Sequence, residues 1–227
     1  MNVTPPVYIK PFSKKWWENV WYYYKWYIVG GIFLIILLIM FLAECVFNVQ
    51  PDFTATYIGG LENMGQVQAY QLEDRFATVT KDINNDGQKA TKVNIIYLDK
   101  DSGSEEMAAM YNMADIEMAG GDAVVFLFSE LFLDRYADYG FIDLSEYVQE
   151  FGIDESLLRY DESGNVYAIE MRDNPIFTEL ESIETEGLFL AVRPMRPNDR
   201  TAWQKDNYEN GLEMARYIIS GGTAVPQ

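Results

Sequence analysis

The chain has 227 residues, enough for one ordinary domain and an additional segment. It carries 17 basic and 35 acidic residues, and the net charge of −18 excludes a general nucleic-acid binder, because a phosphate backbone requires basic side chains. The chain contains no histidine and one cysteine, which excludes histidine triads, histidine zinc sites and intrachain disulfides. We therefore expect a protein that is not an enzyme and has no cofactor.

A membrane anchor is predicted near the N-terminus. Residues 26–43 contain no charged side chain, and they are bounded by Lys25 and Glu44. Eighteen helical residues span about 27 Å, close to the hydrocarbon thickness of a bilayer. Because the buried helix of a globular protein rarely stays apolar on every face, we predict a transmembrane helix over residues 26–47.

The charges on either side of this helix predict its orientation. Residues 1–25 contain four lysines and one acidic residue. Residues 51–227 contain 13 basic and 33 acidic residues. By the positive-inside rule, the tail of residues 1–25 is cytoplasmic and the large domain is extracellular, in a single-pass protein of the cell membrane.

An aromatic segment precedes the apolar run. Eight of the twelve residues 16–27 are aromatic: Trp16, Trp17, Trp21, Tyr22, Tyr23, Tyr24, Trp26 and Tyr27. Tryptophan and tyrosine favour the headgroup layer, so we interpret the segment as an anchor at the interface of the lipid bilayer. The alternative is a docking face for another membrane subunit.

The single cysteine, Cys45, follows Leu42, Ala43 and Glu44, an arrangement that resembles a bacterial lipobox. Glu44 occupies the position where that pattern has a small residue. Signal peptides also have shorter apolar cores than this chain. We therefore expect an uncleaved anchor, with lipidation of Cys45 as the alternative.

Beyond a linker at residues 48–52, residues 53–227 match one domain in size. Apolar patterns in this region predict strands at 53–60, 92–99, 123–128, 165–170 and 188–194, and helices at 64–81, 104–119, 129–140 and 201–220. Alternation of strands and helices predicts an α/β fold with a parallel sheet covered by helices.

A possible calcium loop lies at residues 82–87, with the sequence DINNDG. Asp82, Asn84, Asp86 and Gly87 match the first half of an EF-hand loop. Val93 stands where the loop requires a bidentate acidic ligand. We therefore interpret the segment as a polar turn, and weak calcium binding is the alternative.

Two segments carry a resemblance to a known family. Residues 121–148, GDAVVFLFSELFLDRYADYGFIDLSEYV, resemble a first-lobe segment of the extracellular solute-binding proteins of ABC transporters. Residues 161–169, DESGNVYAI, resemble the strand of that family that leads to the hinge. The resemblance implies a periplasmic-binding-protein-like α/β lobe and a function in recognition, with a small solute or an ABC transporter as the partner.

The chain departs from this family in length. Complete members have two lobes, and only 58 residues follow Ile169 here, so we expect a single first lobe. The rival hypothesis is a structural or regulatory membrane subunit whose lobe is a scaffold for protein interaction. An aromatic-lined pocket with convergent polar groups would favour solute binding. A filled strand-end region with an exposed apolar patch would favour the scaffold.

Ligands of α/β sheets bind at the carboxyl ends of the strands. The residues that we expect there are Gly59, Gly60, Asp99, Ser129, Glu130 and, on the hinge side, Asn174. Tyr57 and Phe128, on the same strands, are expected to face the core. Ser129 has no histidine to activate it, so none of these residues is expected to be catalytic.

The predicted orientation can be tested on intact cells. Protease added outside should remove residues 51–227, because the acidic domain follows the lysine-rich tail and the membrane helix. Immunoblotting of an N-terminal tag should then show a fragment of the tail and helix. Full protection of the domain in intact cells, with cleavage only after lysis, would refute this orientation.

Overall fold

The computed structural model of the protein describes residues 10–47, 50–98, 103–180 and 183–226. The chain divides into two units, one before Gln50 and one from Gln50 onward. The first unit is dominated by one helix, and the second contains the sheet and all other helices.

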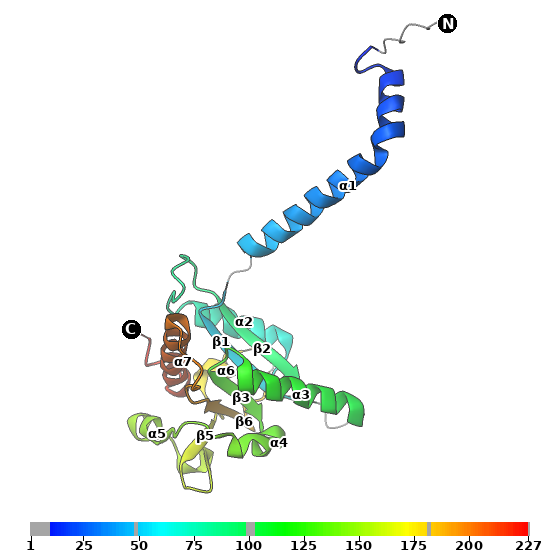
Figure 1. Ribbon diagram of the computed structural model, residues 1–227. Coiled ribbons are helices and arrows are strands. Elements are labelled where there is room, and N and C mark those ends of the chain that lie inside the picture. Colours follow the sequence, from blue (N-terminus) through cyan, green and yellow to red (C-terminus); the bar gives the residue numbers. More distant parts are fainter. Residues whose placement is uncertain (1–9, 48–49, 99–102, 181–182, 227) are drawn as a thin grey trace, which may run out of the picture. The chain divides into compact units, whose positions relative to one another are not determined.

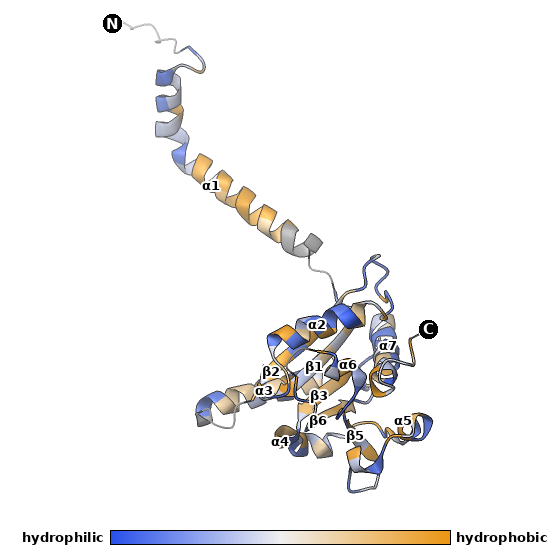
Figure 2. Cartoon of the chain, turned by 180° about the vertical axis from the view of Figure 1, so that it is seen from behind, coloured by the Kyte–Doolittle hydropathy of each residue, from blue (hydrophilic) through white to orange (hydrophobic). Residues whose placement is uncertain are grey.

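Helix α1 (Lys14–Phe47) is continuous through the aromatic segment and the apolar run. Figure 2 shows the change from polar to apolar residues along α1, and the helix bends where the two parts meet. Its 29 residues Lys14–Leu42 are long and apolar enough to cross a membrane, although a signal sequence would meet the same criteria. Seven of the eight predicted interface aromatics are exposed on α1, and Trp16 is partly buried. The side chain of Cys45 lies outside the described residues.

The second unit is an α/β domain, as predicted. Its strands are β1 (Phe53–Gly59), β2 (Thr91–Tyr97), β3 (Val125–Ser129), β4 (Leu158–Tyr160), β5 (Val166–Glu170) and β6 (Leu188–Val192). Its helices are α2 (Gln66–Ala77), α3 (Ser104–Gly120), α4 (Glu130–Leu133), α5 (Ser145–Phe151), α6 (Pro175–Thr178) and α7 (Ala202–Ile219), with 3-10 helices η1 (Asp134–Tyr139) and η2 (Glu155–Leu157).

The sheet is mixed, so the prediction of a parallel sheet is wrong for half of it. The strand order is β2-β1-β3-β6-β5-β4. β2, β1 and β3 are parallel, whereas β6 is antiparallel to both β3 and β5, and β4 is antiparallel to β5. A parallel pair requires a crossover of a dozen or more residues, usually with a long helix, and the described residues between β5 and β6 contain only the four-residue helix α6. The chain therefore returns in the opposite direction.

Helices cover both faces of the sheet (Figure 1). On one face, the core includes side chains of α2, α6 and α7. On the other face, it includes side chains of α3, α4 and η1. Every residue of β1, β3, β5 and β6 is buried, which explains why β3, β5 and β6 are largely continuous apolar runs, whereas β1 also buries Thr54 and Thr56.

Asp52 fixes the start of the domain. Its fully buried carboxylate accepts hydrogen bonds from the backbone N–H groups of Ile83, Asn84 and Ala90, at 2.9, 3.3 and 3.0 Å. The carbonyl oxygen of Asp52 accepts a 2.8 Å hydrogen bond from the side chain of Asn210 on α7. One residue therefore joins the entry of β1 to the loop before β2 and to the last helix.

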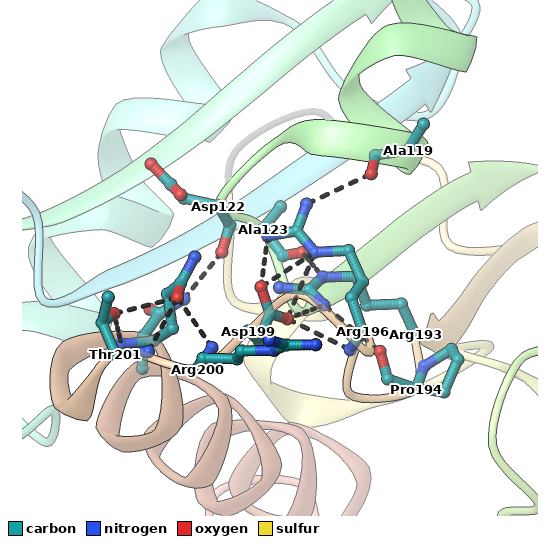
Figure 3. Close-up of polar contacts among 11 residues, drawn as sticks. Ala119, Asp122, Ala123, Arg193, Pro194, Arg196, Asp199, Arg200 and Thr201 are labelled. Carbon is teal, nitrogen blue, oxygen red and sulfur yellow. Dashed lines mark hydrogen bonds and ion pairs between the residues drawn. The ribbon is translucent and has the colours of Figure 1, made fainter.

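A second buried polar cluster follows β6 (Figure 3). Arg193 is 2% exposed, donates to the carbonyl oxygen of Ala123 at 2.6 Å and pairs with Asp199 at 3.1 Å. Arg196 also pairs with Asp199 and donates to the carbonyl oxygen of Ala119 at 3.3 Å. Burial raises the pKa of Asp199, but the hydrogen bonds from both arginines outweigh burial and hold it below its ordinary value.

The Asp52→Ala substitution should lower the free energy of unfolding by about 3 kcal/mol, because three buried N–H groups lose their acceptor. Denaturant unfolding of the full chain in detergent measures this loss. The matched control is Asp86→Ala in the same loop, where the carboxylate is exposed and the expected loss is below about 1 kcal/mol. Equal losses would contradict the role of Asp52.

The Asp199→Asn substitution should cost about 3 kcal/mol at neutral pH, because two arginines lose their buried counter-charge. The folded-state pKa of Asp199 lies below its unfolded value, so its contribution is present above the unfolded pKa and lost as the pH falls through the folded pKa. The stability difference between the two proteins should therefore shrink in acid. A difference that stays constant down to the acid transition would refute this account.

Candidate functional site

The candidate site is the carboxyl edge of the sheet, where β1, β2, β3 and β5 all end. β5 shares the direction of the parallel strands because it is antiparallel to β6, which is antiparallel to β3. The edge brings Gly59 and Gly60 together with Ser129, and it places Glu130 and the segment after Glu170 along the same border. Asp99, predicted to join them, lies outside the described residues.

Tyr57 fills the space between β1 and β3 at this edge. Its ring is fully buried, as expected, and its hydroxyl donates a 2.6 Å hydrogen bond to the carbonyl oxygen of Gly60. A Cβ at Gly59 would collide with this hydroxyl and with the hydroxyl of Ser129. Burial raises the pKa of Tyr57, and Glu62 raises it further, while the Ser129 hydroxyl opposes them. The glycine is therefore required by the buried tyrosine that packs against it at this edge.

The segment between β5 and β6 is bonded to the same edge. The side-chain amide of Asn63 donates to the carbonyl oxygens of Glu184 and Glu186, both at 2.9 Å. The backbone N–H of Glu130 donates to the carbonyl oxygen of Gly187 at 2.7 Å. These bonds hold the returning chain against the ends of β1 and β3.

An ion pair between a buried carboxylate and an exposed arginine lies at the end of β5. Glu170 is 4% exposed, and its carboxylate accepts hydrogen bonds from Arg172, at 3.0 and 3.1 Å, and from the backbone N–H of Gly187, at 2.8 Å. These hydrogen bonds raise the pKa of Arg172 above its ordinary value. Glu170 therefore connects the end of β5 to the return segment, and Arg172 extends toward solvent.

Beside this ion pair lies a cavity of about 300 Å³. Its walls come from the ends of α5 and α7 and from the residues after β5. They are mainly apolar, with Glu170, Arg172, Asn174, Ser220 and Thr223 as polar members. Cavities that bind small molecules start at about this volume. No tyrosine or tryptophan lines the cavity.

Asn174 contributes to this wall but has a structural role. It caps α6, since its oxygen accepts from the backbone N–H of Ile176 at 3.0 Å. Its amide nitrogen donates to the carbonyl oxygen of Ile218 on α7 at 2.8 Å. Glu130 is likewise engaged, in a 2.9 Å ion pair with Arg159.

The predicted calcium segment forms a turn. The carboxylate of Asp82 accepts hydrogen bonds from the backbone N–H groups of Asp86 and Gly87, and the side chains of Asn84 and Asp86 accept from the backbone N–H groups of Asp86 and Gln88. Within the described ranges, no group of three or more His, Cys, Asp or Glu side chains is placed to hold a metal ion.

Glu170 is the site residue that the sequence reasoning did not single out. A glutamate that ends the apolar run VYAI, two residues before an arginine, is the signal that could have indicated it. Asn63 carries no such signal, because its role depends on a contact between segments more than 120 residues apart, and Gly187 carries none because it contacts Glu130 and Glu170 only through its backbone.

Comparison of the chain with protein-family models, curated proteins and solved structures gives no match. The function must therefore be argued from the geometry of the edge and from the surface around it.

The Gly59→Ala substitution should destabilise the protein by about 1–3 kcal/mol, because the new methyl group displaces the Tyr57 hydroxyl and the Ser129 hydroxyl. Thermal unfolding of the full chain checks this. Gly120→Ala is the control: no atom lies within 4 Å of the added Cβ at the end of α3. A Gly59→Ala protein as stable as the Gly120→Ala protein would show that the edge is open.

Proposed function

We propose that this protein is a membrane-anchored, non-enzymatic interaction module. Its extracellular domain resembles the first lobe of a solute-binding protein and acts as a scaffold for a partner protein. The α1 helix anchors it in the cell membrane. The partner is a membrane subunit, such as a component of an ABC transporter.

The course of the chain at the edge supports the resemblance to a single lobe. In the solute-binding family, the strand that β5 resembles leads to the hinge and the second lobe. Here the chain leaves β5 at Glu170, passes through 17 residues and returns as β6 beside it. This is the arrangement expected if the second lobe is replaced by a short connection.

The observation that carries the scaffold proposal is the closed edge. The family binds its ligand between the lobes, at the strand ends. Tyr57 fills that space here, and Asn63 and Glu130 hold the return segment over it. A solute would have to displace a buried tyrosine ring and several hydrogen bonds.

Exposed apolar side chains support the same proposal. Leu61 beside the edge, Val67 and Tyr70 on α2, and Met113 and Ile116 on α3 are all more than half exposed. These side chains do not form one patch, because α2 packs on one face of the sheet and α3 on the other. Neighbouring apolar side chains on a surface mark interaction sites, and on α3 Met113 and Ile116 are three residues apart on the same side of the helix. An acidic domain with such side chains is suited to bind a protein.

Solute binding is the second candidate function, and the cavity beside Glu170 and Arg172 favours it. The apolar walls would hold a small apolar group, and the guanidinium of Arg172 would pair with a carboxylate on the ligand. The volume of about 300 Å³ limits such a ligand to the size of an amino acid or a small sugar.

Native mass spectrometry of the full chain, extracted from its own membranes in mild detergent, tests the proposal. The expected result is a complex with a different protein at fixed stoichiometry. In parallel, thermal unfolding is followed with sugars, amino acids, short peptides and calcium, and no stabilising shift is expected.

A solute that raises the melting temperature by several degrees would support the second candidate instead. Its shift should then disappear in Arg172→Ala, which removes the charge at the cavity. The shift should persist in Arg200→Ala, a matched loss of an exposed arginine elsewhere in the domain.

A further inference from the structure

Helix α3 projects from the domain. Figures 1 and 2 show its amino-terminal half extending beyond the sheet, away from the other helices. None of the described side chains from Glu105 to Met113 is buried, and the first buried side chain along the helix is that of Ala114. The amino-terminal half packs on the core through the partly buried side chains of Met107, Met110 and Tyr111, and the second half is the more deeply buried.

The second half is fixed firmly. Ala114 and Met118 are fully buried in the core. Asp115 accepts hydrogen bonds from Arg135 at 3.3 Å and from the hydroxyl of Tyr136 at 3.2 Å. The guanidinium of Arg135 also lies 4.1 Å from the centre of the Tyr111 ring. The projecting half is thus held in one direction by contacts from η1.

The outward face of α3 carries a row of apolar or small residues: Ala109, Met113, Ile116 and Gly120. We name this row the α3 seam. Its spacing of four, three and four residues is that of the a and d positions of a coiled coil. Met113 is 52% exposed and Ile116 is 70% exposed, so the seam has no partner among the described residues. Small residues at its ends would let another helix approach closely.

The charges of α3 indicate which kind of partner can bind the α3 seam. The helix contains four acidic residues, Glu105, Glu106, Asp115 and Glu117, and no lysine or arginine. A second copy would bring the same acidic helix and a net charge of −18. An anionic bilayer surface attracts helices with basic flanks, and α3 has the opposite charge. Both occupants are disfavoured by repulsion.

We propose that the α3 seam is the docking site for an amphipathic helix of the partner protein, whose apolar face packs on Met113 and Ile116 and whose flanking lysine or arginine residues pair with Glu105 and Glu106. This inference rests on the proposed function, because it assumes a protein partner. It adds the surface that is used and the chemistry of the partner. Apolar packing supplies affinity, and the charges determine which helix is accepted.

The test places a benzoylphenylalanine photocrosslinker at Ala109 in the full chain and irradiates intact cells. One discrete adduct, heavier than the chain, is expected, and mass spectrometry should identify a helix with an apolar face and basic flanks. Met113→Glu should reduce the adduct at least tenfold. The matched control is Tyr160→Glu, which alters a side chain of similar exposure, 48%, on β4. β4 forms the edge of the sheet opposite β2, and the substitution should leave the yield of the adduct unchanged.

A second variant tests the role of charge. The double substitution Glu105→Lys and Glu106→Lys should also reduce the yield of the adduct at least tenfold, because it would repel the basic residues of the partner helix. Thermal unfolding should be the same in all variants, because every substituted side chain is exposed. An adduct of twice the chain mass, an adduct with lipid alone, or a yield that Met113→Glu does not change would overturn the proposal.

Native mass spectrometry separates the two possible failures. A partner complex that persists in Met113→Glu would refute the role of the α3 seam and leave the scaffold function standing. Absence of any partner complex from the unsubstituted chain would refute both.

Discussion

The short connection from β5 to β6 is the constraint on which the rest of the domain depends. The described part of these 17 residues contains one short helix and none of the length usual in a crossover, and β6 runs antiparallel between β3 and β5. The same residues then lie along the carboxyl edge, where Asn63, Glu130 and Glu170 bind their backbone groups. The antiparallel direction of β6, the closure of the edge and the burial of Glu170 therefore all follow from the short connection.

Because the edge is closed, a binding site is expected on the surface of the domain and not at the strand ends. An open edge would offer the ligand site common to α/β sheets. Tyr57 and Gly59 pack against each other there instead, so the space is protein core. Exposed apolar side chains remain on the helices α2 and α3 and in the loop at Leu61, and the second half of α3 is anchored by Asp115 and η1.

The excess of acidic residues is not confined to the surface. Asp52, Glu170 and Asp199 are buried, and each accepts several hydrogen bonds from N–H groups. Buried carboxylates are tolerated only when they are satisfied in this way. Asp52 joins segments more than 30 residues apart, Glu170 joins the end of β5 to the start of β6, and Asp199 holds the turn after β6, so these residues determine how the strands and loops are connected. Acidic residues without such partners, on α3 among other places, determine which surfaces can approach the domain.

The sequence by itself determined the spans of the long elements, because each apolar run or helical period is a local signal: β1, β3, β5, β6, α3 and α7 lie within a few residues of their predicted ranges. It also located the aromatic segment and the apolar part of α1. Only the tertiary structure decided strand direction, the three-residue strand β4 and the closed edge. The direction of a strand does not change its apolar periodicity, and the three residues of β4 are too few to show a period. Closure of the edge depends on hydrogen bonds that Tyr57 and Asn63 make to residues outside their own segments. The sequence could therefore indicate where a ligand would bind in a fold of this class, but not that a tyrosine already occupies the place.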